Sequence, residues 1–120
     1  MTGEKIEGGC RCGAIRFVAL GPPRLIANCH CSDCRKATGS AFTTFVDYER
    51  DEVTFNTPPK SFVSSANAER LFCEHCGSPI AFRGEASPDE INIHLGAFDH
   101  PEKFQPSEEC HQESALWRTK

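Results

Sequence analysis

The sequence has no apolar stretch long enough to cross a membrane and no run rich in lysine and arginine. A membrane-spanning helix needs about 18 or more apolar residues. Proteins that bind nucleic acids usually carry a basic face, whereas this chain has a net charge of -4. We therefore expect neither a membrane nor a nucleic acid as its main partner.

Large apolar residues are also scarce. Ile, Leu, Val and Phe together make only about a fifth of the 120 residues, which is little material for a hydrophobic core. The polar start, Met1–Lys5, is not followed by the apolar segment of a secretory signal peptide. These features predict a soluble cytoplasmic protein whose fold depends on more than apolar burial.

Cysteine, in contrast, is abundant and clustered. Seven of the eight cysteines form three groups: Cys10 and Cys12; Cys29, Cys31 and Cys34; Cys73 and Cys76. Disulfides are the alternative to metal binding, but a C-x-C pair closes on itself only with strain, and three cysteines within six residues crowd any pairing scheme. In a reducing cytoplasm such clusters are typical of metal ligands.

The rest of the pattern predicts short strands and one short helix. Apolar alternation and β-rich composition indicate strands over residues 14–20, 25–29, 41–48, 53–55, 61–65, 70–73, 79–83 and 91–95. A helix is expected over 32–38, with Ser32 as N-cap and Gly39 as terminator. We therefore predict a mainly β fold, a single domain over residues 1–120 with a core at about 5–100 and an irregular tail at 101–120.

The outer cysteine pairs predict a closed zinc site. Zinc prefers four sulfur or nitrogen ligands in a tetrahedron, and the simplest set joins Cys10 and Cys12 to Cys73 and Cys76. Gly13 and Gly77 follow these pairs and permit tight turns. A different pairing among the clusters stays possible at this stage.

The middle trio predicts a second zinc with an open position. Three protein ligands and one exchangeable position are the usual plan of a catalytic zinc, and an incoming thiol bound there would lose its proton. A fourth protein ligand would instead close the site; the candidates are Cys110, His111, His94 and His100. His30 and His75 lie inside clusters, where we expect a supporting or surface role.

Basic and small polar residues surround the trio. Arg35 and Lys36 are candidates for binding the carboxylates of a substrate, with Arg11 and Arg16 as further cations. Thr38, Gly39 and Ser40 are candidates for a polar pocket lining. An ordinary solvated face is the alternative for all of them.

Three segments resemble the signatures of the glutathione-dependent formaldehyde-activating enzyme family. They are residues 8–17 (GGCRCGAIRF), 29–42 (CHCSDCRKATGSAF) and 72–79 (FCEHCGSP). Their order and spacing cover roughly residues 5–100, most of the chain. His100 stands where the family often has an acidic residue, and the end of the chain, from Cys110 on, follows the family only loosely.

The resemblance implies a zinc-bound β-tent domain of short antiparallel strands, related in fold to methionine sulfoxide reductase B. It implies a structural zinc on Cys10, Cys12, Cys73 and Cys76, and an activity-linked zinc on Cys29, Cys31 and Cys34. The implied activity is that of a carbon–sulfur lyase that joins glutathione to formaldehyde. The alternative function is a non-catalytic zinc scaffold that binds another protein.

Overall fold

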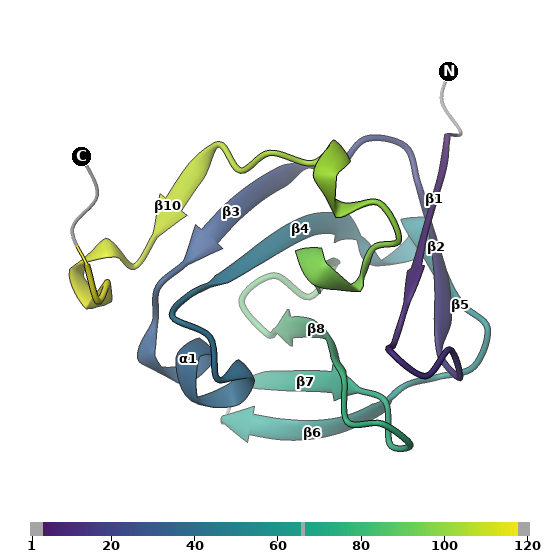
Figure 1. Ribbon diagram of the computed structural model, residues 1–120, viewed down its shortest axis with the longest axis horizontal. Helices are drawn as coiled ribbons and strands as arrows, with labels where there is room; N and C mark the ends of the chain where they lie inside the picture. The colour runs from purple at the N-terminus through teal and green to yellow at the C-terminus, as the bar shows by residue number, and fades with distance from the viewer. Residues whose placement is uncertain (1–3, 66, 118–120) are drawn as a thin grey trace.

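The structure, a computed structural model that describes residues 4–65 and 67–117, contains two β-sheets (Figure 1). The small sheet has the order β1 (Lys5–Gly9), β2 (Arg16–Leu20), β5 (Val53–Phe55). The large sheet has the order β10 (Glu108–Cys110), β3 (Leu25–Cys29), β4 (Thr43–Glu49), β9 (Glu90–His94), β8 (Pro79–Gly84), β7 (Ala68–Phe72), β6 (Lys60–Ser65).

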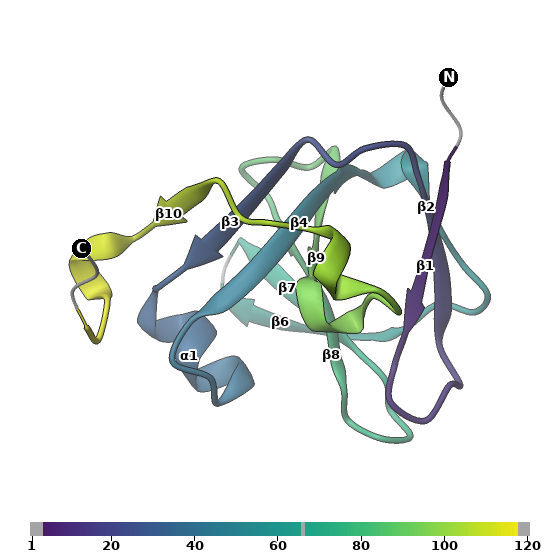
Figure 2. The ribbon, with the colours of Figure 1, turned by 45° about the horizontal axis from the view of Figure 1, so that its top comes forward.

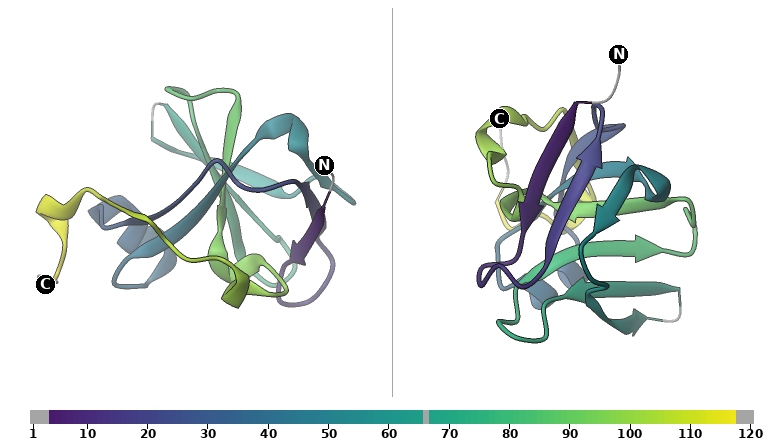
Figure 3. Two further views of the ribbon diagram at one scale, coloured as in Figure 1. Left: turned by 90° about the horizontal axis from the view of Figure 1, so that it is seen from above. Right: turned by 90° about the vertical axis from the view of Figure 1, so that its right-hand side faces the viewer.

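The large sheet curves across the molecule, and the small sheet closes one side of it. Seen from that side, β1 and β2 cross in front of strands of the large sheet (Figure 3, right). Short 3-10 turns join the strands at η1 (Arg50–Glu52), η2 (Leu95–Ala97), η3 (Pro101–Lys103) and η4 (Gln112–Ser114). In the described part of the chain, no helix has the length and hydropathy of a membrane span.

The prediction of a mainly β fold of short strands is confirmed, with two differences. The sequence pattern did not indicate β1, and the tail is not wholly irregular. Its segment β10 pairs with β3 in parallel, the exception among otherwise antiparallel pairings of the described strands (Figure 2). β10 has the sequence Glu-Glu-Cys, which shows no apolar alternation. It is recognised as a strand only from its pairing with the edge strand β3. The single-domain assignment stays a prediction.

The helix α1 (Ser32–Thr38) has the predicted bounds, but Ser32 is not its N-cap. Cys31 takes that place, because its backbone is extended and its Sγ accepts a hydrogen bond from the Cys34 N–H at 3.2 Å. Gly39 ends the helix as predicted, with φ of 78° and its N–H bonded to the carbonyl of Arg35. A zinc-ligand candidate therefore also starts the helix.

The hydrophobic core lies between the two sheets. Strand alternation directs Phe17 and Ala19 of β2 inward, and the same period buries Ile91 and Ile93 of β9. Phe98 packs edge-on against Phe17, with ring centroids 5.2 Å apart. The core cluster also contains two cysteines of the predicted closed zinc site, Cys10 and Cys73.

Close packing around β1 makes Gly8 intolerant of a side chain. A Cβ there would lie 2.4 Å from the carbonyl oxygen of Ala97 and 2.5 Å from the Phe17 ring. Gly8→Ala is therefore expected to destabilise the fold by about 1–3 kcal/mol, as overpacking does. Urea unfolding measures the change. Gly96→Ala is the control, since its Cβ would meet nothing within 4 Å; equal effects of the two substitutions would contradict the prediction.

Candidate metal centres

Four cysteines from the two sheets meet in one group. Cys10 and Cys12 lie in the turn after β1, and Cys73 and Cys76 lie in the turn between β7 and β8. Their sulfurs are all within 4.8 Å of one another. The Sγ of Cys12 is 3.6 Å from that of Cys10 and 3.8 Å from that of Cys73. The group thus links the small sheet to the large one, as the simplest ligand set predicts.

Two tight turns aim these sulfurs at one point. Gly13 and Gly77 have φ of 85° and 80°, a region that glycine adopts without steric cost. The N–H of Ile15 donates to the Cys10 Sγ at 3.3 Å, and the Ser78 hydroxyl lies 3.1 Å from the Cys76 Sγ. Hydrogen bonds of this kind favour the ionised form of a thiol.

The ionisation of this group is uneven. Hydrogen bonds from Ser78 lower the pKa of Cys76 to about 5. The backbone N–H of Ala14 lowers the pKa of Cys12, but hydrogen bonding with Cys10, burial, and hydrogen bonding with Cys76 and Cys73 outweigh this and raise the pKa to about 11. Four sulfurs this close cannot all ionise unless a cation lies among them. The donor set therefore fits a divalent, sulfur-loving metal ion such as Zn2+.

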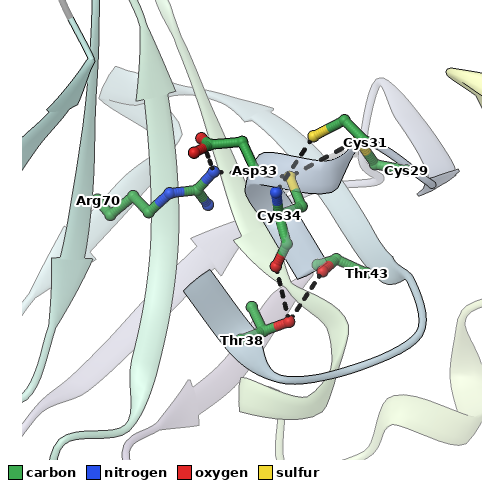
Figure 4. Close-up of polar contacts among 7 residues, drawn as sticks. All are labelled: Cys29, Cys31, Asp33, Cys34, Thr38, Thr43 and Arg70. Atoms are coloured by element: carbon green, nitrogen blue, oxygen red, sulfur yellow. Dashed lines mark hydrogen bonds and ion pairs between the residues drawn. The ribbon is translucent and has the colours of Figure 1, made fainter. Parts of the chain in front are cut away.

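The three middle cysteines form a second, separate group (Figure 4). Cys29 ends β3, Cys31 caps α1, and Cys34 lies in the first turn of the helix. Their sulfurs are also within 4.8 Å of one another, and those of Cys29 and Cys34 are 3.7 Å apart. Cys34 is buried, whereas Cys29 and Cys31 are half-buried, so the group lies close to solvent.

In this trio too, the sulfurs are too close for all of them to ionise without a cation. The hydrogen bond between Cys29 and Cys34 lowers the pKa of Cys29. The same hydrogen bond, together with burial, raises the pKa of Cys34. Burial also raises the pKa of Cys31. One thiolate is thus favoured over three while no cation is bound, and a divalent metal would remove that limit.

The described residues supply no fourth ligand to the trio. Within residues 4–65 and 67–117, no further cysteine, histidine or carboxylate joins either group. The candidates that lie outside both are Cys110, His111, His94, His100, His30 and His75. His30 is buried and bonds through Nε2 to Glu109 Oε1 at 2.7 Å, which ties β10 to the trio segment.

The two predicted substrate anchors, Arg35 and Lys36, lie beside the C-terminal segment. Arg35 donates through Nη1 to the carbonyls of His30 and Ser114, at 3.0 and 2.7 Å, so it holds the C-terminal segment against α1. Lys36 is exposed. Both line a shallow depression of about 400 Å³ beside Leu116. Their role toward a substrate stays a prediction.

Sequence reasoning missed Arg70, on β7. This arginine is 8% exposed, and its Nη2 donates to Asp33 Oδ2 at 2.7 Å and to the Cys34 Sγ at 3.6 Å (Figure 4). Arg70 is 36 positions from Cys34. In the local sequence Ala-Glu-Arg-Leu-Phe, it looks like an ordinary charge on the solvent face of a strand. Only the packing of α1 on the sheet reveals the contact.

A cleft of about 620 Å³ opens beside the first cysteine group: Cys10 is among its lining residues, whereas Cys29, Cys31 and Cys34 are not. Cys10 of the first group and the neighbouring Ser78 line one part of it, and Thr38 and Thr43 line another. Thr38 Oγ1 donates to the Cys34 carbonyl at 2.9 Å and lies 3.4 Å from Thr43 Oγ1, so this wall adjoins the trio (Figure 4). The other lining residues include Ser40, Phe42, Arg11, Arg16 and His94.

A family model described as glutathione-dependent formaldehyde-activating enzyme matches residues 5–114. The chain belongs to this family. The match contains all eight cysteines and both groups, and it confirms the resemblance seen in the three cysteine motifs.

Two curated relatives are similar over most of the chain. One, from Schizosaccharomyces pombe, is named "Uncharacterized lyase" and is 36% identical over 91 residues, covering 74% of this chain and 66% of the relative. The other, from Halomonas elongata, is named "Putative glutathione-dependent formaldehyde-activating enzyme" and is 28% identical over 103 residues, covering 78% and 66%. The chain thus spans about two thirds of the length of these relatives.

A crystal structure of a Rhodobacter sphaeroides protein has a similar fold, with a TM-score of 0.66 and 17% sequence identity. The similarity covers 87% of this chain and 99% of that one. At this identity the likeness concerns the fold alone. The relation to methionine sulfoxide reductase B stays a prediction.

Proposed function

We propose that this chain is a zinc-dependent enzyme of the carbon–sulfur lyase type that uses a small thiol such as glutathione. One observation carries the proposal: three cysteines converge without a fourth ligand from the described residues, while a separate group has all four. Membership of the glutathione-dependent formaldehyde-activating enzyme family supports it. The relative named as a lyase supports the reaction class.

Cys10, Cys12, Cys73 and Cys76 would hold a structural zinc, and Cys29, Cys31 and Cys34 would hold a second one. When bound by the trio, zinc supplies an exchangeable position at which a thiol loses its proton at neutral pH. Both groups need reduced cysteines, which favours the cytoplasm as the working compartment.

The cleft offers groups that suit a thiol with carboxylates, such as glutathione. The Arg16 guanidinium is already paired with both oxygens of Asp99, at 3.0 and 2.5 Å. Arg11 is exposed at the cleft and is therefore the better cation for a substrate carboxylate. The Ser40 hydroxyl lines the same cleft and suits a peptide-like amide group, whereas the Thr38 hydroxyl already donates to the Cys34 carbonyl.

His94 adds a neutral hydrogen-bonding group to the cleft. Burial, and to a lesser extent the charge of Arg70, lower its pKa to about 4. The imidazole is therefore uncharged at pH 7 and presents one donor and one acceptor nitrogen. This is the ionisation state that a ligand in the cleft would meet.

In the proposed reaction, the sulfur of the thiolate forms a bond to the carbonyl carbon of formaldehyde or a similar small carbonyl compound. The carbonyl oxygen takes up a proton, so that a hydroxymethyl thioether results. In the reverse, lyase direction the carbon–sulfur bond breaks, the hydroxyl proton is lost, and the thiolate leaves. Neither direction needs an oxidant or a reductant.

Titration of the cobalt-substituted protein with glutathione tests the proposal. Co2+ bound by thiolates absorbs visible light, and its spectrum depends on the ligand set. We expect a saturable spectral change as glutathione joins the trio. S-methylglutathione is the matched control, because it keeps both carboxylates and lacks the thiol. An unchanged spectrum with glutathione, or an equal change with both compounds, would remove the basis of the proposal.

The alternative, a non-catalytic scaffold, has weaker support. It would need an exposed apolar patch away from the cysteine groups. Phe62 and Val63 of β6 are 52% and 73% exposed, but they are adjacent in the strand and so point to opposite faces. Scattered apolar residues of this kind are normal on soluble proteins.

A further inference from the structure

We propose that Arg70 is a positioning residue whose buried charge balances the Cys29, Cys31 and Cys34 site and keeps it loaded with metal. This inference rests on the proposed function. Arg70 approaches from β7, on the opposite side of Cys34 from Cys29, and is the cation whose hydrogen bond reaches a trio sulfur in the described part of the chain (Figure 4).

The burial of Arg70 is the first argument. Its side chain is 10% exposed and its guanidinium carbon lies 5.0 Å from the centroid of the Phe82 ring. Taking such a cation out of water costs several kcal/mol. Its carboxylate partner in the structure is Asp33, whose side chain is 60% exposed. An ion pair with so exposed a group offsets only a small part of the cost of burying Arg70. A second, buried negative charge is needed.

The trio supplies that charge at Cys34 when it holds a metal ion, because all three cysteines are then thiolates, whereas the metal-free trio favours only one. Three thiolates around one divalent ion leave a net charge of about -1. Cys34, 4% exposed, is the sulfur that Arg70 contacts, at 3.6 Å from Nη2. Nε and Nη1 of Arg70 are buried and have no partner among the described residues, so the guanidinium has donor capacity left for an anionic neighbour.

The contact also has a consequence for reactivity. A cation that hydrogen-bonds a ligand sulfur withdraws negative charge from it, so the metal is less completely neutralised by its own ligands. An incoming thiol then loses its proton more readily. Arg70 would act through Cys34, without touching the substrate.

Metal affinity in charge variants tests this role. Arg70→Met keeps most of the side-chain stem and removes the charge; we expect the affinity of the trio for Co2+ to fall about 10- to 100-fold, the usual effect of losing a partner of a metal ligand. Arg70→Lys keeps the charge and should retain most of the affinity. Arg83→Met is the matched control, because Arg83 lies on the neighbouring strand β8 and pairs with Glu69.

The Asp33→Asn variant separates charge from architecture. Asp33 and Cys34 share the Nη2 donor of Arg70, so removal of the Asp33 charge leaves that donor to the sulfur, and we expect the affinity for Co2+ to be retained or to rise. If the Arg70–Asp33 ion pair merely held α1 in place, both Asp33→Asn and Arg70→Met would lower the affinity. That parallel loss would overturn the proposal, as would wild-type affinity in Arg70→Met.

Competition with a chelator, followed by the cobalt spectrum, gives the affinity of each site, and the four-cysteine group serves as the internal reference for folding. If Arg70→Met does not bind metal even at that group, the other two variants still decide the question. The proposal then requires that Arg70→Lys retains most of the affinity for Co2+ and that Asp33→Asn does not lower it. We also expect the pH at which glutathione changes the cobalt spectrum to rise in Arg70→Met. Glutathione without effect on the wild-type spectrum would refute the proposed function, yet leave the affinity test of Arg70 intact.

Discussion

Replacement of Cys73 by alanine is expected to unfold the protein. Cys73 is fully buried, belongs to the hydrophobic core, and lies in the group that links the small sheet to the large one. Its substitution would remove a core side chain and one of the four proposed zinc ligands at once. Removing zinc with a strong chelator should have the same outcome.

The magnitudes decide this expectation. Joining Cys12 to Cys73 closes a loop of 61 residues, which costs roughly 3–4 kcal/mol in chain entropy. A structural zinc site contributes on the order of 10–16 kcal/mol of apparent binding free energy. The whole stability of a domain is about 5–15 kcal/mol. Because the metal term is as large as the whole stability, we expect the loss of one ligand together with a core side chain to exceed what a core this poor in large apolar residues can offset.

Circular dichroism and urea unfolding of Cys73→Ala measure the effect. The control is Cys110→Ala, since Cys110 is a half-buried cysteine outside both groups. We expect that control to keep its fold and its metal. A Cys73→Ala protein with the urea midpoint of the wild type would show that apolar packing alone suffices.

The division of the cysteines could be predicted from the sequence because ligand spacing is local. When two cysteines lie within three or four residues of each other, the turn between them determines the directions of both sulfurs. Gly13 and Gly77 indicate such turns, because glycine adopts a positive φ without steric cost. The bounds of α1 could also be predicted, since the residues that begin a helix and the glycine that ends it are local signals. Only the N-cap prediction is wrong. Serine is a commoner N-cap than cysteine, but here the Sγ of Cys31 accepts the hydrogen bond from the Cys34 N–H.

Arg70 and β10 show where sequence reasoning ended. The role of Arg70 depends on how α1 packs against β7, and nothing near position 70 encodes that contact. β10 depends on an open edge at β3 and on Glu109, which bonds to both Asn28 and His30. Pairings of this kind are tertiary, and strand propensity is overridden by them. The resemblance to a known family gave no help, because neither Arg70 nor residues 108–110 lie in the three segments that carry it.

Substitution of Cys31 is expected to abolish the activity and leave the fold intact. The residue contributes one sulfur to the trio and none to the group that joins the two sheets. We expect the zinc content to fall from two ions per chain to one. Loss of metal assistance removes several kcal/mol of transition-state stabilisation, which corresponds to a rate loss of at least about 100-fold.

Cys31 has a second role that the choice of variant can separate. Its Sγ caps α1 by accepting from the Cys34 N–H, and losing an N-cap costs typically about 1 kcal/mol. Cys31→Ala should therefore lose the second zinc and also that stability. Cys31→Ser should lose the zinc and keep the cap, because a serine hydroxyl accepts the same hydrogen bond.

Zinc content, urea midpoint and the rate of thiol addition to formaldehyde, measured on both variants, give three separate results. Equal zinc loss with unequal stability is the pattern expected if Cys31 is both ligand and cap. Two zinc ions retained in Cys31→Ser would mean that the trio is not a metal site. Loss of both zinc ions together with the fold would mean that the two groups share ligands, in conflict with the separation of their sulfurs into two clusters. If Cys31→Ser loses one zinc and keeps the fold, the trio can be emptied without unfolding the domain, as expected if the four-cysteine group carries the link between the two sheets.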